Sequence, residues 1–193
     1  MKKLILSTVI SIFSLFSIQA QELTEISLEK STVEWTGEKV TGSHSGFINL
    51  KSAFFLFEDN KLVGGEFEID MNSINCTDIE SPQYSAKLEN HLKSNDFFAT
   101  EKYPISSFKI TNVIFDGTSY MITGNITIKD ISQKITFPAQ FHSHGNVFHA
   151  DASIKIDRTV HDIKYGSGSF FDDLGDKMIY NEFTLNIHLE GSK

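Results

Sequence analysis

The stretch IYNEFTLNIHL, residues 179–189, alternates apolar and polar side chains over most of its length. Phe183, Leu185, Ile187 and Leu189 fall on one side of an extended chain, and the residues between them are polar. A period of two places successive side chains on opposite faces of a β-sheet. This stretch therefore predicts a strand with one buried face and one face in water.

The same alternation recurs along the chain and makes strands the main element of the predicted fold. It is found at residues 33–35, 48–50, 55–57, 67–71, 122–128, 135–137 and 150–156. Turn sequences separate the runs, for example EDNK at 58–61, DGTS at 116–119, HGN at 144–146 and LGDK at 174–177. About eight half-buried antiparallel strands must pack on a second sheet or close into a barrel, and a closed barrel of that size has room for one slender ligand.

One segment, residues 81–98, departs from the strand pattern. Ser81 is a typical N-cap residue, and Pro82 suits the first helical position because its missing N–H would be unpaired there anyway. A further short turn after this helix carries Phe97 and Phe98. We therefore predict an all-β fold of about eight antiparallel strands with one helical segment at about residues 81–98.

The first twenty residues are typical of an export signal. They contain two lysines, an apolar run and a small residue, Ala20, at the expected cleavage position. The alternative is an uncleaved membrane anchor, but an apolar run of roughly 15 residues is short for a bilayer. The sequence thus predicts a signal peptide at 1–20 and a single domain at 21–193 in a bacterial periplasm.

Charge and cysteine content exclude several function classes. The formal net charge is −8, and loss of Lys2 and Lys3 with the signal peptide would make it −10. An acidic chain without clustered Lys and Arg argues against nucleic acid and against an electrostatic hold on anionic lipid. Cys76 is the only cysteine, so no internal disulfide can form.

Phenylalanine dominates the aromatic residues, with seventeen copies against one tryptophan. Phe suits an apolar tunnel and a solid core equally, because it is wide, rigid and free of polar atoms. Phe54 and Leu56 lie opposite Phe55 and Phe57, so AFFLF is apolar on both sides. This pattern indicates a contact with another subunit, a membrane surface or the helix, and it is compatible with a homodimer.

Several longer stretches together resemble the YceI-like family of exported lipid-binding domains. They are VEWTGEKVTGSHSGFINLKSAFFLF, KLVGGEFEIDMNSI, KLENHLKSNDFFATEKYPISSFKITNV, YMITGNITIKDISQKITFPAQF and ASIKIDRTVHDIKYGSGSFFDDLGDKMIYNEFTLNIHLEG, in that order. The resemblance implies a lipocalin-like antiparallel barrel with the helical segment at about 81–98 covering one end. It also implies that the barrel holds a long-chain amphiphile, either a polyisoprenoid of the quinone type or a fatty-acyl lipid. Two departures concern loops: Asp130 stands where glycine is common, and His161 and Asp162 replace an aromatic residue and Gly or Asn. They bear on the shape of the mouth and on head-group preference.

The inward-facing residues are predicted to line the ligand tunnel. They are Trp35, Ile48, Leu50, Phe55, Phe57, Phe67, Ile69, Phe97, Phe98, Phe108, Ile110, Ile122, Phe137, Ile154, Phe183 and Leu185. Two polar residues complete the predicted site. Arg158 follows the inward-facing residues Ile154 and Ile156 at the same spacing of two. It is therefore either a head-group anchor or half of a structural ion pair, with Asp157 or another carboxylate, that closes a strand end. Tyr165 is either a hydrogen-bond donor to a quinone or carboxyl oxygen, or a buried tyrosine with a backbone partner.

Other functions stay open at this stage. An interaction protein would have a solid core and use the face of Phe54 and Leu56, whereas an enzyme would need a cluster such as His161, Asp162 and Asp157. We expect no catalysis, no cofactor beyond the bound lipid, and a transient contact with a membrane or a membrane redox protein.

His142, His144 and His149 lie close together in sequence and suggest either a Zn²⁺ or Cu²⁺ site or an exposed hairpin. The exposed hairpin is the simpler interpretation of their polar alternation.

Overall fold

The computed structural model describes residues 21–192, and antiparallel strands make up most of them. In chain order the elements are β1 (Glu22–Glu25), β2 (Thr32–Lys39), β3 (Gly42–Phe47), β4 (Asn49–Glu58), β5 (Lys61–Asp70), η1 (Met71–Ser73), α1 (Pro82–Lys93), β6 (Ile105–Phe115), β7 (Tyr120–Ile128), β8 (Ile131–His144), β9 (Val147–Asp157), η2 (Arg158–His161), η3 (Gly175–Lys177) and β10 (Ile179–Ser192). The predicted signal peptide at 1–20 lies outside the described residues. Across residues 21–192, no helix has the length and apolar character that a membrane span requires.

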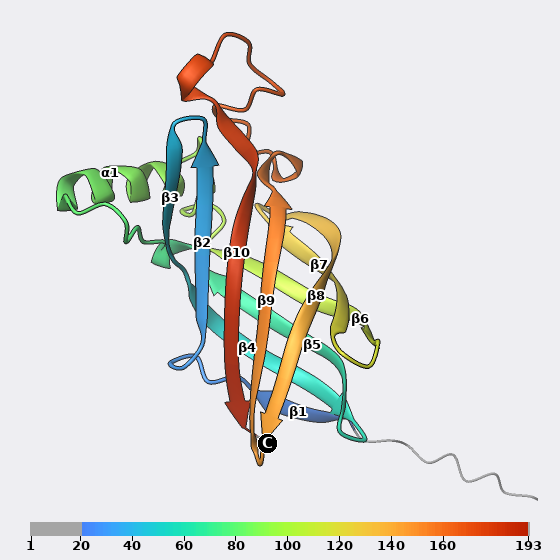
Figure 1. Ribbon diagram of the computed structural model, residues 1–193. Coiled ribbons are helices and arrows are strands. Elements are labelled where there is room, and N and C mark those ends of the chain that lie inside the picture. Colours follow the sequence, from blue (N-terminus) through green and yellow to red (C-terminus); the bar gives the residue numbers. More distant parts are fainter. Residues whose placement is uncertain (1–20, 193) are drawn as a thin grey trace, which may run out of the picture.

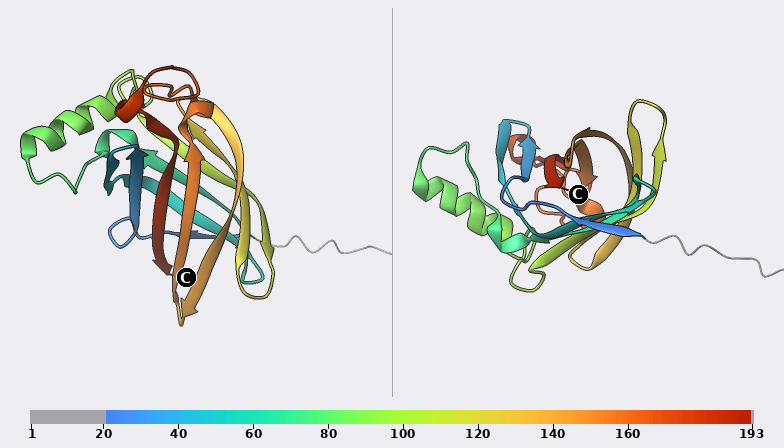
Figure 2. Two further views of the ribbon diagram at one scale, coloured as in Figure 1. Left: turned by 45° about the horizontal axis from the view of Figure 1, so that its top comes forward. Right: turned by 90° about the horizontal axis from the view of Figure 1, so that it is seen from below.

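All ten strands join one antiparallel sheet in the order β1-β4-β5-β6-β7-β8-β9-β10-β2-β3, and this sheet curls around an interior (Figures 1 and 2). The two ends of the sheet order are β1 next to β4, and β3 next to β2. The chain joins these ends directly, because only Ile48 separates β3 from β4. β3 pairs with β2, whereas β4 pairs with β5. The Ile48 amide donates to the Val33 carbonyl at 3.0 Å, and Ile26 bridges to Gly191 on β10. Alternation left a sandwich and a barrel open, and the curled sheet confirms the antiparallel barrel that the YceI-like resemblance implied.

The strand number is ten rather than about eight. The short strand β1 directs Thr24 inward and leaves Leu23 half exposed, so it gives no apolar alternation. β3 reads GSHSGF, and its buried position is a glycine, Gly46. Both strands lie at the ends of the sheet order, and backbone pairing with a neighbour defines them rather than an apolar face. β6 is likewise absent from the alternating runs, and its register with β7 shifts between Ile110 and Asn112, whereas the runs at 48–50 and 55–57 belong to the one strand β4.

The predicted helical segment contains α1 and a following turn. Ser81 occupies the N-cap position and Pro82 begins the helix, but the Ser81 side chain makes no capping hydrogen bond. The Phe97 amide donates to the Ser94 carbonyl at 3.1 Å, which forms the expected turn. α1 lies at the upper end of the barrel in Figure 1 and projects beside it, and none of its residues is fully buried.

An aromatic cluster fills the lower end of the barrel, near the β8–β9 turn. Phe55, Phe57, Phe141 and Phe148 contact one another, and the rings of Phe141 and Phe148 stack with centroids 5.1 Å apart. A Cβ on Gly191 would come within 2.3 Å of the Phe148 ring, so glycine is required beside it. The cluster closes this end of the interior with apolar rings.

The two departures from the YceI-like pattern lie in backbone positions that favour glycine. Lys129 and Asp130 form the β7–β8 turn with φ of 51° and 59°, and Asp162 has φ of 57°. Asp tolerates this left-handed region better than most residues, which explains how it replaces Gly or Asn there. Lys129 Nζ donates to the Asp162 carbonyl at 2.9 Å and joins the two loops.

Candidate ligand-binding tunnel

The barrel encloses a cavity of about 530 Å³. Small-molecule pockets in proteins commonly measure roughly 300–1,000 Å³ and are largely apolar. The predicted residues that line this cavity are Trp35, Ile48, Leu50, Phe55, Phe67, Ile69, Phe97, Phe98, Phe108, Ile110, Ile122, Phe137, Ile154, Arg158, Tyr165, Phe183 and Leu185. The inward faces assigned by alternation thus converge on one hollow.

Phe57 is the predicted lining residue that does not border the cavity. It is only 2 % exposed, and its ring lies 6.0 Å from Phe141 and 6.1 Å from Phe148. Phe57 faces inward as predicted, but it lies one inward position nearer the closed end than Phe55. Its assignment to the ligand wall was therefore wrong, and it belongs to the floor beneath the cavity.

Sequence reasoning also missed part of the wall. Further lining residues on the strands are Val33, Leu62, Tyr120, Ile126, Ile128, Ile135, Ala139, Phe141, Ala150, Ala152, Ile179, Ile187 and Leu189. Most continue the same alternating runs, so the signal was present in the sequence. Leu88, His91 and Leu92 join from α1, and no strand pattern could have placed them.

The open end of the cavity is bordered by polar and aromatic residues. Lys39 and His44 come from the β2–β3 hairpin, and Lys177 comes from η3. Tyr165 is 45 % exposed, and its ring packs edge-on to His91 with centroids 4.7 Å apart. One end of the hollow is therefore sealed by phenylalanine, whereas the other offers hydrogen-bonding groups.

Phe97 and Phe98 close the cavity from the side of α1. Phe97 is buried beside Tyr165 at 5.4 Å between centroids, and Phe98 meets Phe183 edge-on at 6.2 Å. Both rings border the cavity, as predicted. Together they form an apolar part of the cavity wall next to the polar residues of the open end.

Arg158 lines the cavity but serves mainly to hold the backbone. Its Nε donates to the Tyr180 carbonyl at 3.0 Å, its Nη1 to Ile163 at 2.7 Å and its Nη2 to Ile179 at 3.1 Å. Burial lowers the pKa of Arg158, and the nearby charge of Asp157 opposes this shift.

The alternative of an Arg158–Asp157 ion pair was wrong. The Asp157 carboxylate instead accepts the Thr159 amide at 2.8 Å and the Thr159 hydroxyl at 2.6 Å, because Asp157 caps η2. No ion pair within residues 21–192 involves Arg158.

His161 and Asp162 do not form a shared site. His161 is fully buried in the wall, where Nδ1 donates to the Ile131 carbonyl at 3.0 Å, and burial lowers its pKa. Asp162 points to solvent and pairs with Lys164 at 2.7 Å, which lowers the pKa of Asp162. Neither His161 nor Asp162 borders the cavity, so the geometry gives the hypothetical enzyme no pocket around them.

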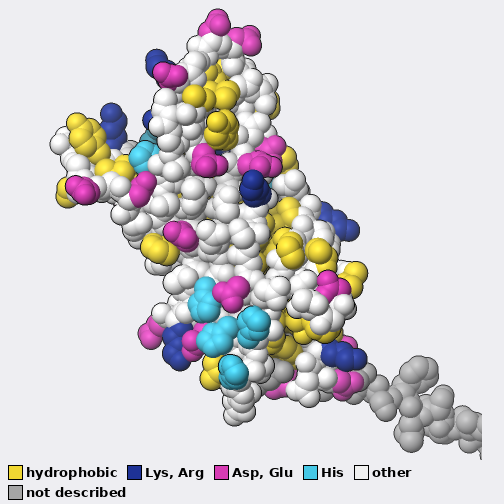
Figure 3. Space-filling view, in the orientation of Figure 1, with side chains coloured by type: hydrophobic (Ala, Val, Ile, Leu, Met, Phe, Trp, Pro, Cys, Tyr) yellow, Lys and Arg dark blue, Asp and Glu magenta, His cyan; other side chains and the backbone are white. Residues whose placement is uncertain are grey.

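The histidine group on β8 and β9 lies on the outer surface. His142 and His149 are cross-strand partners, and the ring of His149 stacks on that of His188 of β10 with centroids 5.5 Å apart. Figure 3 shows histidine side chains gathered on the surface in the lower part of the molecule. Within residues 21–192, the donor atoms of His142, His144 and His149 do not converge as metal ligands would. The simpler prediction of an exposed hairpin describes them.

The cavity argues against the solid core that the interaction-protein alternative would need. Phe54 and Leu56 lie on the outer face of β4, half exposed, where Leu56 pairs with Leu23 of β1. Leu23 is 54 % exposed, so this apolar strip is open to solvent in the single chain.

Comparison with known proteins agrees with this architecture. The profile of the YceI-like domain matches residues 25–191. The chain is 31 % identical over 114 residues to UPF0312 protein plu2095 of Photorhabdus laumondii, covering 55 % of this chain and 54 % of that protein. It is 32 % identical over 127 residues to Protein YceI of Escherichia coli O17:K52:H18, covering 58 % and 64 %. In both cases the chain spans less than two thirds of the relative's length.

A solved structure shows the same fold. The polyisoprenoid binding domain from Saccharophagus degradans, implicated in plant cell wall breakdown, superposes with a TM-score of 0.66 at 12 % identity. The match covers 88 % of this chain and 97 % of that one. Since the profile spans nearly all described residues, the chain belongs to the YceI-like family.

Proposed function

We propose that the protein is a periplasmic carrier for a long-chain amphiphile, either a polyisoprenoid of the quinone type or a fatty-acyl lipid. The observation that carries this proposal is the apolar cavity of about 530 Å³, which has a cluster of phenylalanine rings at one end and polar side chains at the other. The polyisoprenoid-binding description of the Saccharophagus degradans domain supports the same ligand class.

Hydrophobic transfer provides the binding energy in this proposal. Each methylene removed from water contributes about 0.8 kcal/mol, so a chain of several isoprene units needs few polar contacts. The apolar tail would lie toward Phe55, and the head group would lie near Tyr165 and Arg158 at the mouth. A guanidinium has five N–H donors, and three of those on Arg158 already hold carbonyls, which leaves donors for a quinone or carboxylate oxygen.

A tunnel-filling variant tests the proposal. Ala152 lines the cavity, and Ala139 faces it across the β8–β9 pair, so Ala152→Phe fills a wide part of the hollow. Lys155 lies on the same strand with its side chain 71 % exposed, which makes Lys155→Phe a matched control. Native mass spectrometry with ubiquinone and palmitate should show one bound lipid for wild type and for the control, and loss of binding in Ala152→Phe.

Two outcomes would contradict the carrier. One is a wild-type protein that takes up neither lipid, and the other is an Ala152→Phe variant that is folded and binds as well as wild type. The periplasmic location is tested separately by fractionating cells that express the full chain and by determining the N-terminus of the exported form.

We propose further that the apolar strip of Leu23, Phe54 and Leu56 forms a homodimer contact. The strip lies on an outer face and includes half-exposed side chains on two adjacent strands. Light scattering should report a dimer for wild type and a monomer for Phe54→Asp. A monomeric wild type at high protein concentration would contradict this contact.

A further inference from the structure

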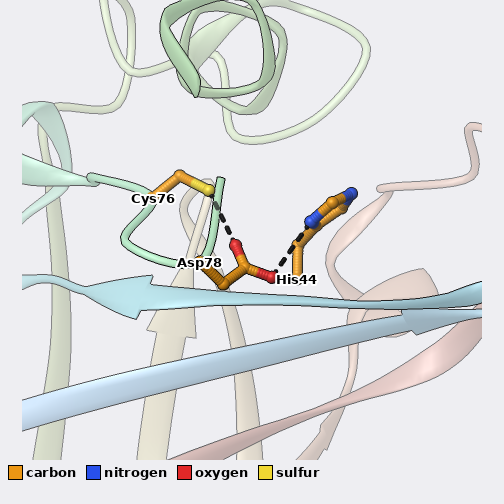
Figure 4. A group of neighbouring side chains, drawn as sticks. All are labelled: His44, Cys76 and Asp78. Atoms are coloured by element: carbon orange, nitrogen blue, oxygen red, sulfur yellow. Dashed lines mark hydrogen bonds and ion pairs between the residues drawn. The ribbon is translucent and has the colours of Figure 1, made fainter. Parts of the chain in front are cut away.

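A compact group of potential metal ligands lies beside the mouth of the tunnel. It consists of His44 on β3, together with Cys76 and Asp78 on the segment between η1 and α1 (Figure 4). His44 Nδ1 lies 3.1 Å from Asp78 Oδ2, and Cys76 Sγ lies 3.0 Å from Asp78 Oδ1. The ligand atoms of all three residues lie within 4.8 Å of one another.

The backbone brings these side chains together by fixing the segment against β3. The Asn75 amide donates to the Phe47 carbonyl at 3.1 Å, and the Thr77 amide donates to the Ser45 carbonyl at 3.0 Å. The segment thus runs along the free edge of β3 in an extended form. Residues two apart on an extended chain point to the same side, which directs both the thiol and the carboxylate toward the histidine.

Two neighbouring residues strengthen this arrangement. Gly46 permits the close approach, because a Cβ there would lie only 2.0 Å from the Asn75 carbonyl oxygen. On the other side Glu89 of α1 accepts the Cys76 amide at 2.9 Å. The segment is therefore held from the strand and from the helix, and its ligands are positioned before any ion binds.

The three donors match the coordination chemistry of zinc. Thiolate, imidazole and carboxylate bind Zn²⁺ at about 2.3, 2.0–2.1 and 2.0–2.2 Å in tetrahedral sites, which places the ligand atoms about 3.3–3.7 Å apart. Asp78 reaches Cys76 and His44 through its two different carboxylate oxygens, at 3.0 and 3.1 Å, and the ligand atoms of the three residues all lie within 4.8 Å of one another. Small side-chain shifts therefore bring one oxygen, the sulfur and the nitrogen to these separations. We infer that His44, Cys76 and Asp78 form a three-ligand Zn²⁺ site with a fourth position open at the tunnel mouth.

The surroundings suit an ion that enters from solvent. The side chains of His44 and Asp78 are 38 % and 32 % exposed, whereas Cys76 is buried behind them. Hard cations such as Ca²⁺ and Mg²⁺ prefer sites made wholly of oxygen, so the thiol and imidazole select against them. In the metal-free protein the same atoms form a hydrogen-bonded chain from thiol to carboxylate to imidazole, and the ion replaces the thiol proton.

Zinc and cobalt titrations of the reduced, metal-free protein test this site. Titration of Zn²⁺ in competition with a chelator should show one Zn²⁺ bound per chain with a micromolar or tighter Kd. Co²⁺, used as a spectroscopic probe, should give the near-ultraviolet charge-transfer band of a thiolate ligand and the visible bands of tetrahedral cobalt. Cys76→Ser should abolish the thiolate band. It should also weaken Zn²⁺ binding by about 100-fold or more, because losing a ligand costs more than the roughly 10–100-fold cost of losing a residue that only orients one.

Two further variants separate coordination from folding and from background binding. His44→Gln alters a partly exposed side chain, so it should fold normally and still weaken Zn²⁺ binding by at least about tenfold. His142→Gln removes an exposed histidine from the outer face and should bind Zn²⁺ as tightly as wild type. A wild-type protein without a thiolate–cobalt band would overturn the inference, as would equal Zn²⁺ affinity in wild type and His44→Gln.

Discussion

At the scale of single residues, buried His161 connects the stability of the barrel to pH. Its Nδ1–H is donated to the Ile131 carbonyl, and burial lowers its pKa below the ordinary value of 6.5. As the pH falls through 6.5, His161 is therefore protonated in the unfolded chain before it is protonated in the folded barrel. This protonation favours the unfolded chain, so the free energy of unfolding decreases as the pH falls. We expect Tm to fall between pH 7 and pH 5 by less in His161→Gln than in wild type.

The matched control for this prediction is His142→Gln on the outer face of β8, where the side chain is exposed. It should keep the pH dependence of wild type. Carboxylates with lowered pKa, such as Asp162 and Glu190, contribute to acid unfolding at lower pH. They are unchanged in wild type, His161→Gln and His142→Gln, so they do not affect the comparison. Identical Tm profiles for wild type and His161→Gln would show that His161 does not control this range.

Gly124 is a second residue whose role can be isolated. A Cβ there would lie 2.4 Å from Phe108 Cζ and 2.5 Å from the Lys109 carbonyl oxygen. Gly→Ala within a strand ordinarily stabilises by about 0.5–1 kcal/mol, but this clash should reverse the sign and cost about 1–3 kcal/mol. Urea unfolding should therefore show a lower midpoint for Gly124→Ala.

Gly37→Ala is the control, because a Cβ at Gly37 meets nothing within 4 Å. Its midpoint should equal that of wild type or exceed it slightly. If both substitutions gave the same change, the close approach of the Phe108 ring would not be what requires glycine at position 124.

At the scale of elements, α1 is held less firmly than the strands. None of its residues is fully buried, and its links to the chain before it are the Glu89 contact with the Cys76 amide and a Ser85 hydroxyl bond to the Cys76 carbonyl at 3.2 Å. Regions with few buried contacts open at lower free energy. We predict faster amide hydrogen exchange in residues 82–93 than in β9, and slower exchange in α1 once palmitate or ubiquinone is bound.

Hydrogen-exchange mass spectrometry measures both effects in one experiment. β9 is the internal reference, because it is paired on both sides, with β8 and with β10. Exchange in α1 as slow as in β9 would mean that the helix is a fixed part of the wall. Unchanged exchange of α1 with bound lipid would separate the helix from ligand entry.

Element by element, alternation in the sequence predicts which side of a strand faces inward but not how far along the barrel a residue lies. Ile154 and Phe183 were therefore placed correctly, whereas Phe57 has the right direction and lies too deep. β1 and β3 lack an alternating run because partner backbones, rather than apolar side chains, define them, and β6 lacks one where its register with β7 shifts between Ile110 and Asn112. The meeting of His44 with Cys76 depends on a tertiary contact more than thirty residues apart in sequence, which no local pattern encodes.

At the scale of the whole molecule, the two ends of the barrel differ in a way that suits lipid exchange at one end. The loop between η2 and β10 rises above the mouth in Figure 1 and carries Phe170 and Phe171, which are 49 % and 51 % exposed. Ile114 and Phe115 expose similar apolar surface, 56 % each, at the end of β6 near the β6–β7 turn. We propose that the loop at the mouth makes the transient contact with a membrane or a membrane redox protein.

Paired double variants test that contact by comparing the two ends. Phe170→Ser/Phe171→Ser should slow the transfer of a fluorescent fatty acid from phosphatidylcholine vesicles several-fold, because the mouth loses its apolar contact with the bilayer while the tunnel wall is unchanged. Ile114→Ser/Phe115→Ser removes comparable exposed surface from the other end and should transfer at the wild-type rate. Equal slowing in both double variants would show that exposed apolar area alone, and not its position at the mouth, sets the rate. If neither variant slowed transfer, the lipid would enter from solution without docking, and the aromatic pair above the mouth would have no part in loading.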